Sequence, residues 1–283
     1  MEKLLKKINI LTNQYIELNI EQSLNWQQFN QYAIVHHSTS IEGSSLTQEE
    51  TDLFLSEEIT AKGKPLLHHL MQKDHFDALK FILNNSIKNT PLSIDFIKKT
   101  ASLIMKNTGG DYNTISGSFN SCNGDLRLVN VYAGQTNFPD FKKVPVLLRR
   151  FCDELNNKLN NIDSSDDILI TSFDAHFNLV SIHPFADGNG RVSRLIMNYI
   201  QNSFDLPLSI VFKEDKADYY KALIETREKE DINIFRFFML NQHIKFLTQE
   251  IDKVLLMQNK VSQILKSDET LKKRKGFGLG LLF

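Results

Sequence analysis

The chain has little proline and little glycine, six and 12 residues out of 283. Because these two residues interrupt regular structure most strongly, their scarcity leaves long segments in which helices can form. Cysteine is scarcer still: Cys122 and Cys152 are the only two. Two such residues form neither a disulfide framework nor a cysteine-based metal site, and they fit a reducing compartment.

No sign of charge dominates either. Lys and Arg number 33 against 34 Asp and Glu, which gives a net charge of -1 and argues against a dedicated binder of nucleic acid or of membrane surfaces. No stretch approaches the roughly 20 apolar residues of a membrane helix, and residues 1–18 lack the unbroken apolar core of a signal peptide. We expect a cytoplasmic protein with no nucleic-acid or membrane partner.

Apolar residues recur at intervals of three and four over most of the chain, which predicts helices. The segments with this pattern are residues 76–87, 93–106, 144–159, 168–182, 192–204, 219–228 and 234–265. Ser93 and Ser164 suit the N-cap position of the helices that follow them. One region differs: Ile115–Pro139 contains an Asn-Gly turn signal and the alternating run LRLVNVY. It predicts a hairpin within an otherwise all-α protein.

The densest group of chemically active residues is the stretch HPFADGNGRVSR, which begins at His183. The preceding helix is expected to end at His183, because the following proline disfavours helical geometry before it, and a new helix begins at about Arg191. Gly188 and Gly190 let the intervening backbone turn tightly and leave room for a ligand. A loop that leads into a helix N-terminus directs backbone N–H groups at one point, which favours a phosphate site.

The side chains of this loop complement a phosphate site. Arg191 and Arg194 share a face of the first helical turn, and arginine matches phosphate oxygens well. One carboxylate beside phosphates, here Asp187, is a usual way to hold Mg²⁺, and His183 can accept a proton near neutral pH. Each residue alone has a structural explanation, as a core histidine, a plain turn or a solvated arginine. Together they indicate attack of a hydroxyl on a nucleotide phosphorus.

HPFADGNGRVSR resembles the signature of the Fic family, His-x-Phe-x-(Asp/Glu)-Gly-Asn-Gly-Arg-x-x-Arg, at every specified position. The neighbouring segments AHFNLVSI, LIMNYI and YYKAL are also similar, so the resemblance extends over about residues 92–247. It implies a Fic-type helical bundle with a small β-hairpin flap over the active site. It further implies transfer of AMP from ATP to a Tyr, Thr or Ser hydroxyl of a target protein, with release of pyrophosphate.

The resemblance assigns a role to each residue of the loop. His183 would be the base that deprotonates the target hydroxyl, Asp187 would hold Mg²⁺ between the α- and β-phosphates, and Phe185 would anchor the loop in the core. The remaining residues of the motif would bind phosphate: Gly188, Asn189 and Gly190 as the anion hole with Asn189 on the α-phosphate, and Arg191 and Arg194 on the β- and γ-phosphates. Doc-like kinases carry lysine at the position of Gly190, so the glycine speaks against that variant.

Two further parts of the site follow from the resemblance. Residues 128–139 correspond to the flap along which a target docks as an added strand. Tyr219 and Tyr220 correspond to the nucleotide-base pocket. Relatives often carry asparagine where this chain has Arg227. The resemblance therefore does not establish hydrogen bonding to adenine, and ATP is taken as the default nucleotide. His176 is interpreted as a core histidine.

A second motif lies upstream, in the segment STSIEG at residues 38–43. Residues 26–35 predict a helix that Gly43 ends, and Ser38 and Glu42, four residues apart, share a face of it. The segment resembles the inhibitory motif (Ser/Thr)-x-x-x-Glu-(Gly/Asn) of many Fic proteins. There the glutamate pairs with the second arginine of the signature, which would be Arg194 here.

We therefore predict an autoinhibited protein adenylyltransferase with self-modification, divided into an N-terminal inhibitory region (1–90), a Fic catalytic domain (91–250) and a C-terminal helix and tail (251–283). Two alternatives stay open: removal of AMP by water that Glu42 activates, and a nucleotide-binding regulatory module with little turnover. The sequence leaves open whether the chain forms a homo-oligomer. It also names neither the target protein nor the trigger that relieves inhibition.

Overall fold

Helices make up most of the computed structural model, which describes residues 1–22, 26–88, 90–134 and 136–276. The helices are α1 (Glu2–Glu17), α2 (Trp26–Ile41), α3 (Gln48–Glu57), α4 (Leu66–Asn84), α5 (Ile94–Ile104), α6 (Val144–Leu159), α7 (Ser165–Ile182), α8 (Asn189–Ser203), α9 (Lys216–Lys229) and α10 (Ile232–Gly276). The predicted helical fold is thereby confirmed. Ser93 and Ser164 cap α5 and α7 as predicted, since each hydroxyl accepts a hydrogen bond from a backbone N–H in the first turn.

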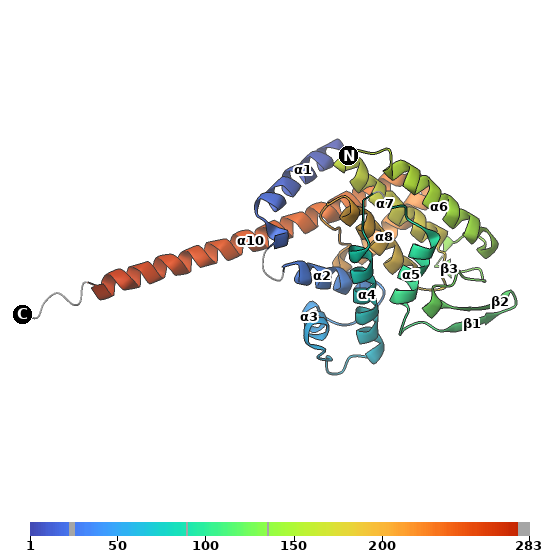
Figure 1. Ribbon diagram of the computed structural model, residues 1–283, viewed down its shortest axis with the longest axis horizontal. Coiled ribbons are helices and arrows are strands. Elements are labelled where there is room, and N and C mark those ends of the chain that lie inside the picture. Colours follow the sequence, from blue (N-terminus) through green and yellow to red (C-terminus); the bar gives the residue numbers. More distant parts are fainter. Residues whose placement is uncertain (23–25, 89, 135, 277–283) are drawn as a thin grey trace, which may run out of the picture.

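Helix α8 is the centre of the fold, because residues on all of its faces are buried. It lies against α7, α4 and α5 (Figure 1). Its buried polar side chains have partners: the Asn198 amide donates to the Ser209 carbonyl at 3.0 Å, and the Gln201 amide donates to Ser172 Oγ at 3.0 Å. A polar helix surrounded by core is stable only with such partners. The second half of the HPFADGNGRVSR motif, which forms the start of α8, therefore lies at the centre of the molecule.

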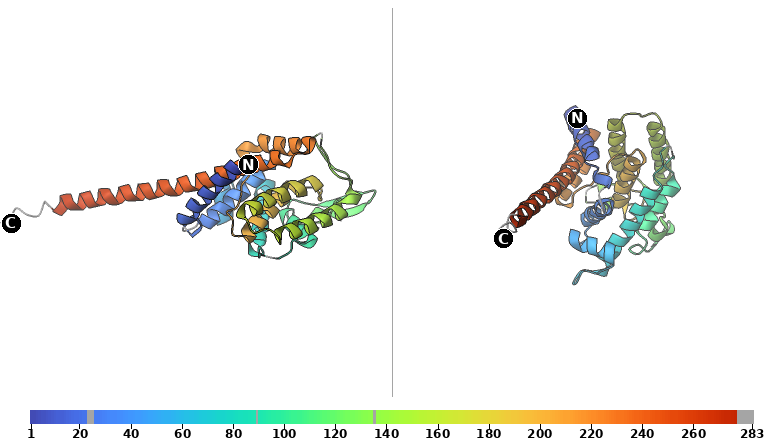
Figure 2. Two further views of the ribbon diagram at one scale, coloured as in Figure 1. Left: turned by 90° about the horizontal axis from the view of Figure 1, so that it is seen from above. Right: turned by 60° about the vertical axis from the view of Figure 1, so that its left-hand side comes forward.

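The N-terminal helices belong to the same core as the rest. Ile8 and Tyr15 of α1 and Ile251 of α10 are members of one hydrophobic cluster, and α1 lies along α10 (Figure 2). Helix α10 continues without interruption through residue 250, where the sequence predicted a boundary, and then projects from the body (Figure 1). Among the helices described, none combines the length and the apolarity needed to span a membrane.

The hairpin predicted within Ile115–Pro139 is present, and it is one of two. Strands β1 (Asp111–Thr114) and β2 (Gly117–Asn120) form one hairpin, and β3 (Tyr132–Ala133) and β4 (Thr136–Asn137) form a second. The Asn-Gly signal makes no hairpin turn. Its glycine, Gly124, is left-handed and ends a short 3-10 helix, Ser121–Asn123, that packs on α5. Within the described residues, the alternating run that follows joins no strand ladder before Tyr132, and its arginine, Arg127, is buried.

Gly124 provides a test of this packing. A β-carbon there would lie 2.0 Å from the Lys98 carbonyl oxygen, and φ is +70°. We expect Gly124→Ala to lower the free energy of unfolding by about 2 kcal/mol or more, from backbone strain and overpacking together. Urea unfolding measures the change. Gly110→Ala, whose β-carbon would meet nothing within 4 Å, is the matched control, and equal losses in the two variants would contradict the packing.

Candidate active site

Two sets of local hydrogen bonds hold the loop between α7 and α8. His183 ends α7 in a left-handed conformation, with φ 53° and ψ 59°, and its N–H donates to the Leu179 carbonyl at 3.1 Å. Asn189 closes the loop: its Oδ1 accepts from the Phe185 N–H and its Nδ2 donates to the Phe185 carbonyl, both at 2.9 Å. Phe185 is buried in the core. The Asn189 side chain thus bonds to the loop itself, and its predicted contact with an α-phosphate stays a prediction.

His183 is oriented and kept neutral. Its Nδ1 lies 3.2 Å from the Val180 carbonyl. Since a carbonyl only accepts, Nδ1 carries the proton and Nε2 carries the lone pair. Burial, against the opposing effect of the Val180 bond and with smaller contributions from the charges of Arg127 and Arg227, lowers the pKa of His183 to about 4. At neutral pH the ring is therefore in the form that can accept a proton.

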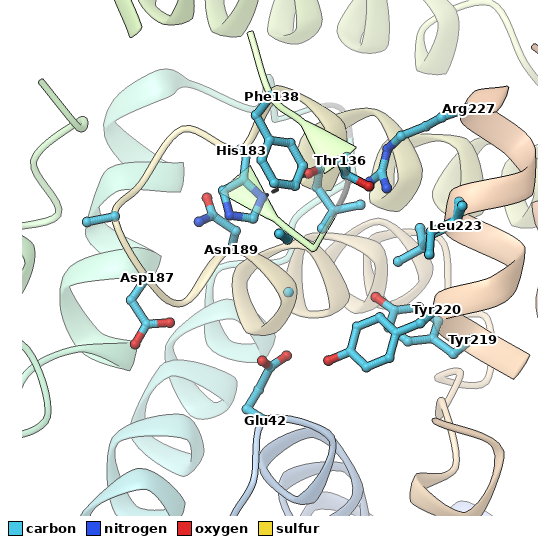
Figure 3. A pocket seen from close by; sticks show the side chains of 15 residues that line it. Glu42, Thr136, Phe138, His183, Asp187, Asn189, Tyr219, Tyr220, Leu223 and Arg227 are labelled. Atoms are coloured by element: carbon cyan, nitrogen blue, oxygen red, sulfur yellow. Dashed lines mark hydrogen bonds between the residues drawn. The ribbon is translucent and has the colours of Figure 1, made fainter. Parts of the chain in front are cut away.

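A cavity of about 400 Å³ lies next to the ring (Figure 3). His183, Asp187 and Asn189 line it from the loop, and Glu42 lines it from the chain just beyond α2. The other walls come from β3–β4, α9 and the adjoining turns: Ala133, Thr136, Phe138, Tyr219, Tyr220, Leu223, Ile224 and Arg227. Asn189 and Gly190 begin α8, so the cavity adjoins the start of a buried helix. The first N–H groups of a helix have no acceptor within it, and an anion is therefore favoured at this end of the cavity.

Arg191 has unsatisfied hydrogen-bond donors at this helix start. The side chain is 3% exposed, and among the described residues its Nε and Nη1 have no hydrogen-bond partner. Nη2 lies 3.3 Å from Met105 Sδ and 3.6 Å from the Asp187 carboxylate. Buried donors without acceptors are costly, and the oxygens of a bound phosphate are one way to satisfy them.

Asp187, the carboxylate of the loop, is accessible to solvent. The Asp187 side chain is 60% exposed, and its Oδ1 also accepts from the Gly188 N–H. Within the described part of the chain, no three His, Cys, Asp or Glu side chains are grouped so as to hold a metal. One exposed carboxylate fits Mg²⁺ when phosphate oxygens and water complete the coordination. Asp187 is therefore suited to a metal that arrives with a nucleotide.

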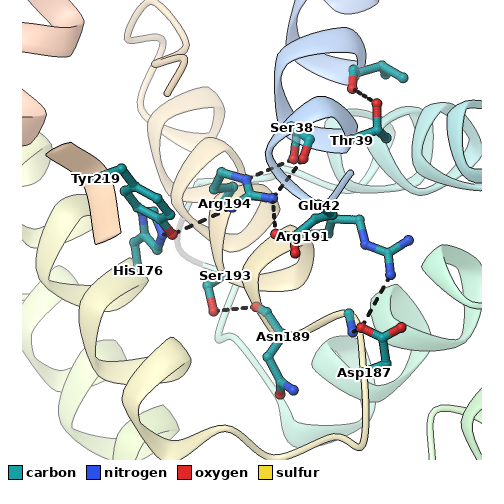
Figure 4. Close-up of polar contacts among 12 residues, drawn as sticks. Ser38, Thr39, Glu42, His176, Asp187, Asn189, Arg191, Ser193, Arg194 and Tyr219 are labelled. Atoms are coloured by element: carbon teal, nitrogen blue, oxygen red, sulfur yellow. Dashed lines mark hydrogen bonds and ion pairs between the residues drawn. The ribbon is translucent and has the colours of Figure 1, made fainter. Parts of the chain in front are cut away.

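Arg194, unlike Arg191, is fully engaged (Figure 4). Its Nε donates to Ser38 Oγ at 2.8 Å, and its Nη2 donates to the Ser38 carbonyl at 2.9 Å and to Glu42 Oε1 at 2.7 Å. The Tyr219 hydroxyl lies 3.5 Å from Nη1 on the other side. The predicted neighbours Ser38 and Glu42 are thus brought to Arg194 across 156 and 152 residues of sequence.

The Glu42–Arg194 pair stays ionised at neutral pH. Burial alone would raise the pKa of Glu42, but the charge and hydrogen bond of Arg194 outweigh it and lower that pKa. Burial likewise opposes the charge of Arg194, and Glu42 raises its pKa. The carboxylate also packs on Gly190, where a β-carbon would lie 2.5 Å from Glu42 Oε1. A larger residue at position 190 would displace Glu42.

The two tyrosines predicted for a base pocket occupy different environments. Tyr219 is buried at 1% exposure, and its hydroxyl lies 2.9 Å from His176 Nε2 as well as near Arg194. Tyr220 is 39% exposed at the cavity wall, where an aromatic ring is available for stacking. Arg227 Nε donates to Ser181 Oγ at 3.2 Å. His176 is buried, as expected of a core histidine.

Residues 91–201 match the family model described as Fic/DOC family. The chain contains a Fic/DOC family domain. Among curated proteins it is similar to the protein adenylyltransferase Fic of Drosophila willistoni, at 30% identity over 203 residues, and to the protein adenylyltransferase fic-1 of Caenorhabditis briggsae, at 27% over 229 residues. These alignments cover 72% and 78% of this chain but 38% and 42% of the relatives. The chain thus spans about two fifths of their length.

Solved Fic structures share the fold. A Fic domain containing signaling protein from Bacteroides thetaiotaomicron aligns with a TM-score of 0.73 at 21% identity, over 88% of this chain and 97% of that one. Fic-1 from C. elegans, residues 134–508, aligns with a TM-score of 0.72 at 23% identity, over 90% and 74% of the two chains. Both alignments extend well beyond residues 91–201, so the N-terminal helices take part in the likeness.

Sequence reasoning included Thr136 and Phe138 in the flap range 128–139 but did not predict that they line the cavity beside His183 (Figure 3). It also missed Arg127, which is buried at 1% exposure. One signal was available: Arg127 is the sole charged residue in the run LRLVNVY. A charge in such a run either faces solvent or has a specific buried partner.

The unsatisfied donors of Arg191 lead to a prediction. Arg191→Ala should weaken the binding of an adenosine triphosphate by about 1.5–3 kcal/mol, the usual contribution of charged hydrogen bonds, which is roughly 10- to 150-fold in affinity. Calorimetric titration measures it, and Arg150→Ala, an exposed arginine of α6, is the control. An affinity equal to that of the wild type would show that Arg191 does not face the phosphates.

Proposed function

We propose that this Fic protein transfers AMP from ATP to a hydroxyl side chain of a target protein and that Glu42 restrains the reaction. The observation that carries the proposal is the convergence on one cavity of a neutral, oriented imidazole and the start of a buried helix. Arg191, with its unsatisfied donors, stands in the first turn of that helix. The adenylyltransferase names of the relatives support the same reaction.

The chemistry follows from these positions. The target hydroxyl loses its proton to His183 Nε2 as its oxygen attacks the α-phosphorus. The bond from that phosphorus to the bridging oxygen breaks, and pyrophosphate leaves. Because little covalent chemistry is required of the protein, positioning and neutralisation of charge provide most of the rate. Asp187 would hold Mg²⁺, which supplies positive charge for the departing pyrophosphate when it is bound.

The restraint is a competition for Arg194. A triphosphate needs the second arginine of the loop for its terminal phosphate, and that arginine is bonded to Ser38 and Glu42. The carboxylate belongs to the same chain, so its effective concentration at the site is high. Removal of AMP by water would need Glu42 as a base, whereas here its Oε1 accepts from Arg194. We therefore retain transfer as the function.

His183→Ala should abolish label transfer from α-labelled ATP, while calorimetric affinity for ATP and the melting temperature stay close to those of the wild type, since the base acts only in the chemical step. The control is His68→Ala on α4, a histidine outside the cavity. Transfer by His183→Ala near the wild-type rate would rule out this residue as the base.

Glu42→Gly should raise adenylylation, including self-modification, above the wild type at equal ATP and Mg²⁺, because Arg194 becomes available. Adding Arg194→Ala should remove the gain, and Ser38→Ala should activate only in part. The matched control is Glu57→Gly, an exposed glutamate at the end of α3. Activity of Glu42→Gly at or below the wild-type level would refute the restraint.

A further inference from the structure

Arg127 is a buried arginine whose bonds all go to backbone carbonyls. It is 1% exposed, and burial lowers its pKa, which the charge of Asp140 opposes. Nε donates to the His183 carbonyl at 2.8 Å, Nη1 to the Val129 carbonyl at 2.7 Å and Nη2 to the Pro139 carbonyl at 2.6 Å. A buried cation is costly, and a planar guanidinium with fixed donors is the side chain that can hold three separate carbonyls at once.

The three carbonyls join two parts of the active site. Val129 and Pro139 stand at the two ends of the segment that contains β3 and β4, here called the flap segment (residues 129–139). The third carbonyl belongs to His183. A fourth bond reinforces the connection, because the Arg127 N–H donates to the Pro184 carbonyl at 3.1 Å. One residue therefore fixes both ends of the flap segment relative to the backbone of the proposed base.

The flap segment also contacts the imidazole directly. Phe138 stacks on the His183 ring, with centroids 3.7 Å apart and planes 19° from parallel. The Arg227 guanidinium lies 5.6 Å from the centre of the Phe138 ring. The His183 ring is thus held at its Nδ1 by Val180 and over one face by Phe138. Its free Nε2 therefore has a set direction.

We propose that Arg127 and Phe138 are positioning residues for the transfer reaction, and that together they fix the distance and orientation between the flap segment and His183. The inference rests on the proposed function. A peptide that adds to the flap as a strand takes its register from the backbone of the flap. The hydroxyl it carries is then placed relative to Nε2 by the bonds of Arg127, and a misplacement of about 1 Å can cost on the order of 100-fold in rate.

Arg127→Lys is the variant that tests the geometry, because it keeps the charge but one ammonium cannot bond three separated carbonyls. Label transfer from α-labelled ATP is measured in the Glu42→Gly background with the chain itself as acceptor. The rate at saturating ATP should fall about 10- to 100-fold. ATP affinity should stay within about twofold, since Arg127 lies outside the phosphate-binding residues. Arg150→Lys, an exposed arginine paired with Glu154, is the control.

Phe138→Leu tests the stacking through a readout that does not depend on activity. Burial lowers the pKa of His183 to about 4, and Arg127, Arg227 and Glu42 are the charged groups that act on it. Removing the stacked ring admits water and should move that pKa upward, toward the ordinary value of about 6.5. In NMR of isotope-labelled histidine between pH 5 and 8, the wild-type His183 ring should stay neutral and the variant ring should titrate.

The outcomes distinguish a failure of the positioning proposal from a failure of the proposed function. Phe237→Leu, at a 40% exposed phenylalanine of α10, should leave the His183 signal unchanged. An unaltered His183 titration in Phe138→Leu, or an unaltered rate in Arg127→Lys, would overturn the positioning roles. Loss of rate and of ATP affinity together in Arg127→Lys would also overturn them, as a general structural defect. Absence of transfer in Glu42→Gly itself would refute the proposed function, and the NMR titration would still decide the role of Phe138.

Discussion

The start of α8 combines two properties that conflict: it is buried, and it is full of hydrogen-bond donors. The first N–H groups of a helix have no acceptor within it, and two arginines follow at 3% exposure each. Several neighbouring segments supply hydrogen-bond acceptors for these donors or fix the loop that precedes them. Asn189 closes the preceding loop on Phe185, and Ser38 and Glu42 reach across from the end of α2. The position of the N-terminal helices is therefore tied to the electrostatics of the loop.

Arg191 and Arg194 differ in how many of their hydrogen-bond donors have acceptors. Arg194 has internal acceptors on both sides, from Ser38 and Glu42 and from the Tyr219 hydroxyl. Arg191 has a weak sulfur contact and an ion pair with the exposed Asp187 at 3.6 Å, and two of its nitrogens are unpaired among the described residues. In the proposed function a nucleotide satisfies Arg191 at once but must displace Glu42 to use Arg194. The same contacts that stabilise the fold then set the threshold for activity.

The sequence predicted what depends on local rules. Ser93 and Ser164 cap the expected helices, α6 has its predicted ends, and the end of α7 at His183 follows from the next proline. One tertiary contact, Glu42 with Arg194, was predicted through the resemblance to the Fic inhibitory motif, but other tertiary contacts were not. The Asn-Gly pair suggested a hairpin turn, but Gly124 instead packs on the Lys98 carbonyl. Tyr219 lines the cavity, and the contact of its hydroxyl with Arg194 was not predicted from the sequence.

The central claim is that Glu42 and a terminal phosphate compete for Arg194, and comparing ATP with ADP tests it most directly. Calorimetric titrations of both nucleotides with Mg²⁺ are carried out on the wild type and on Glu42→Ala. The account predicts similar affinities for ATP and ADP in the wild type. In Glu42→Ala, ATP should bind more tightly than ADP by at least about tenfold, the contribution of the charged hydrogen bonds that the terminal phosphate gains. An equal ratio of the two affinities in both proteins would contradict it.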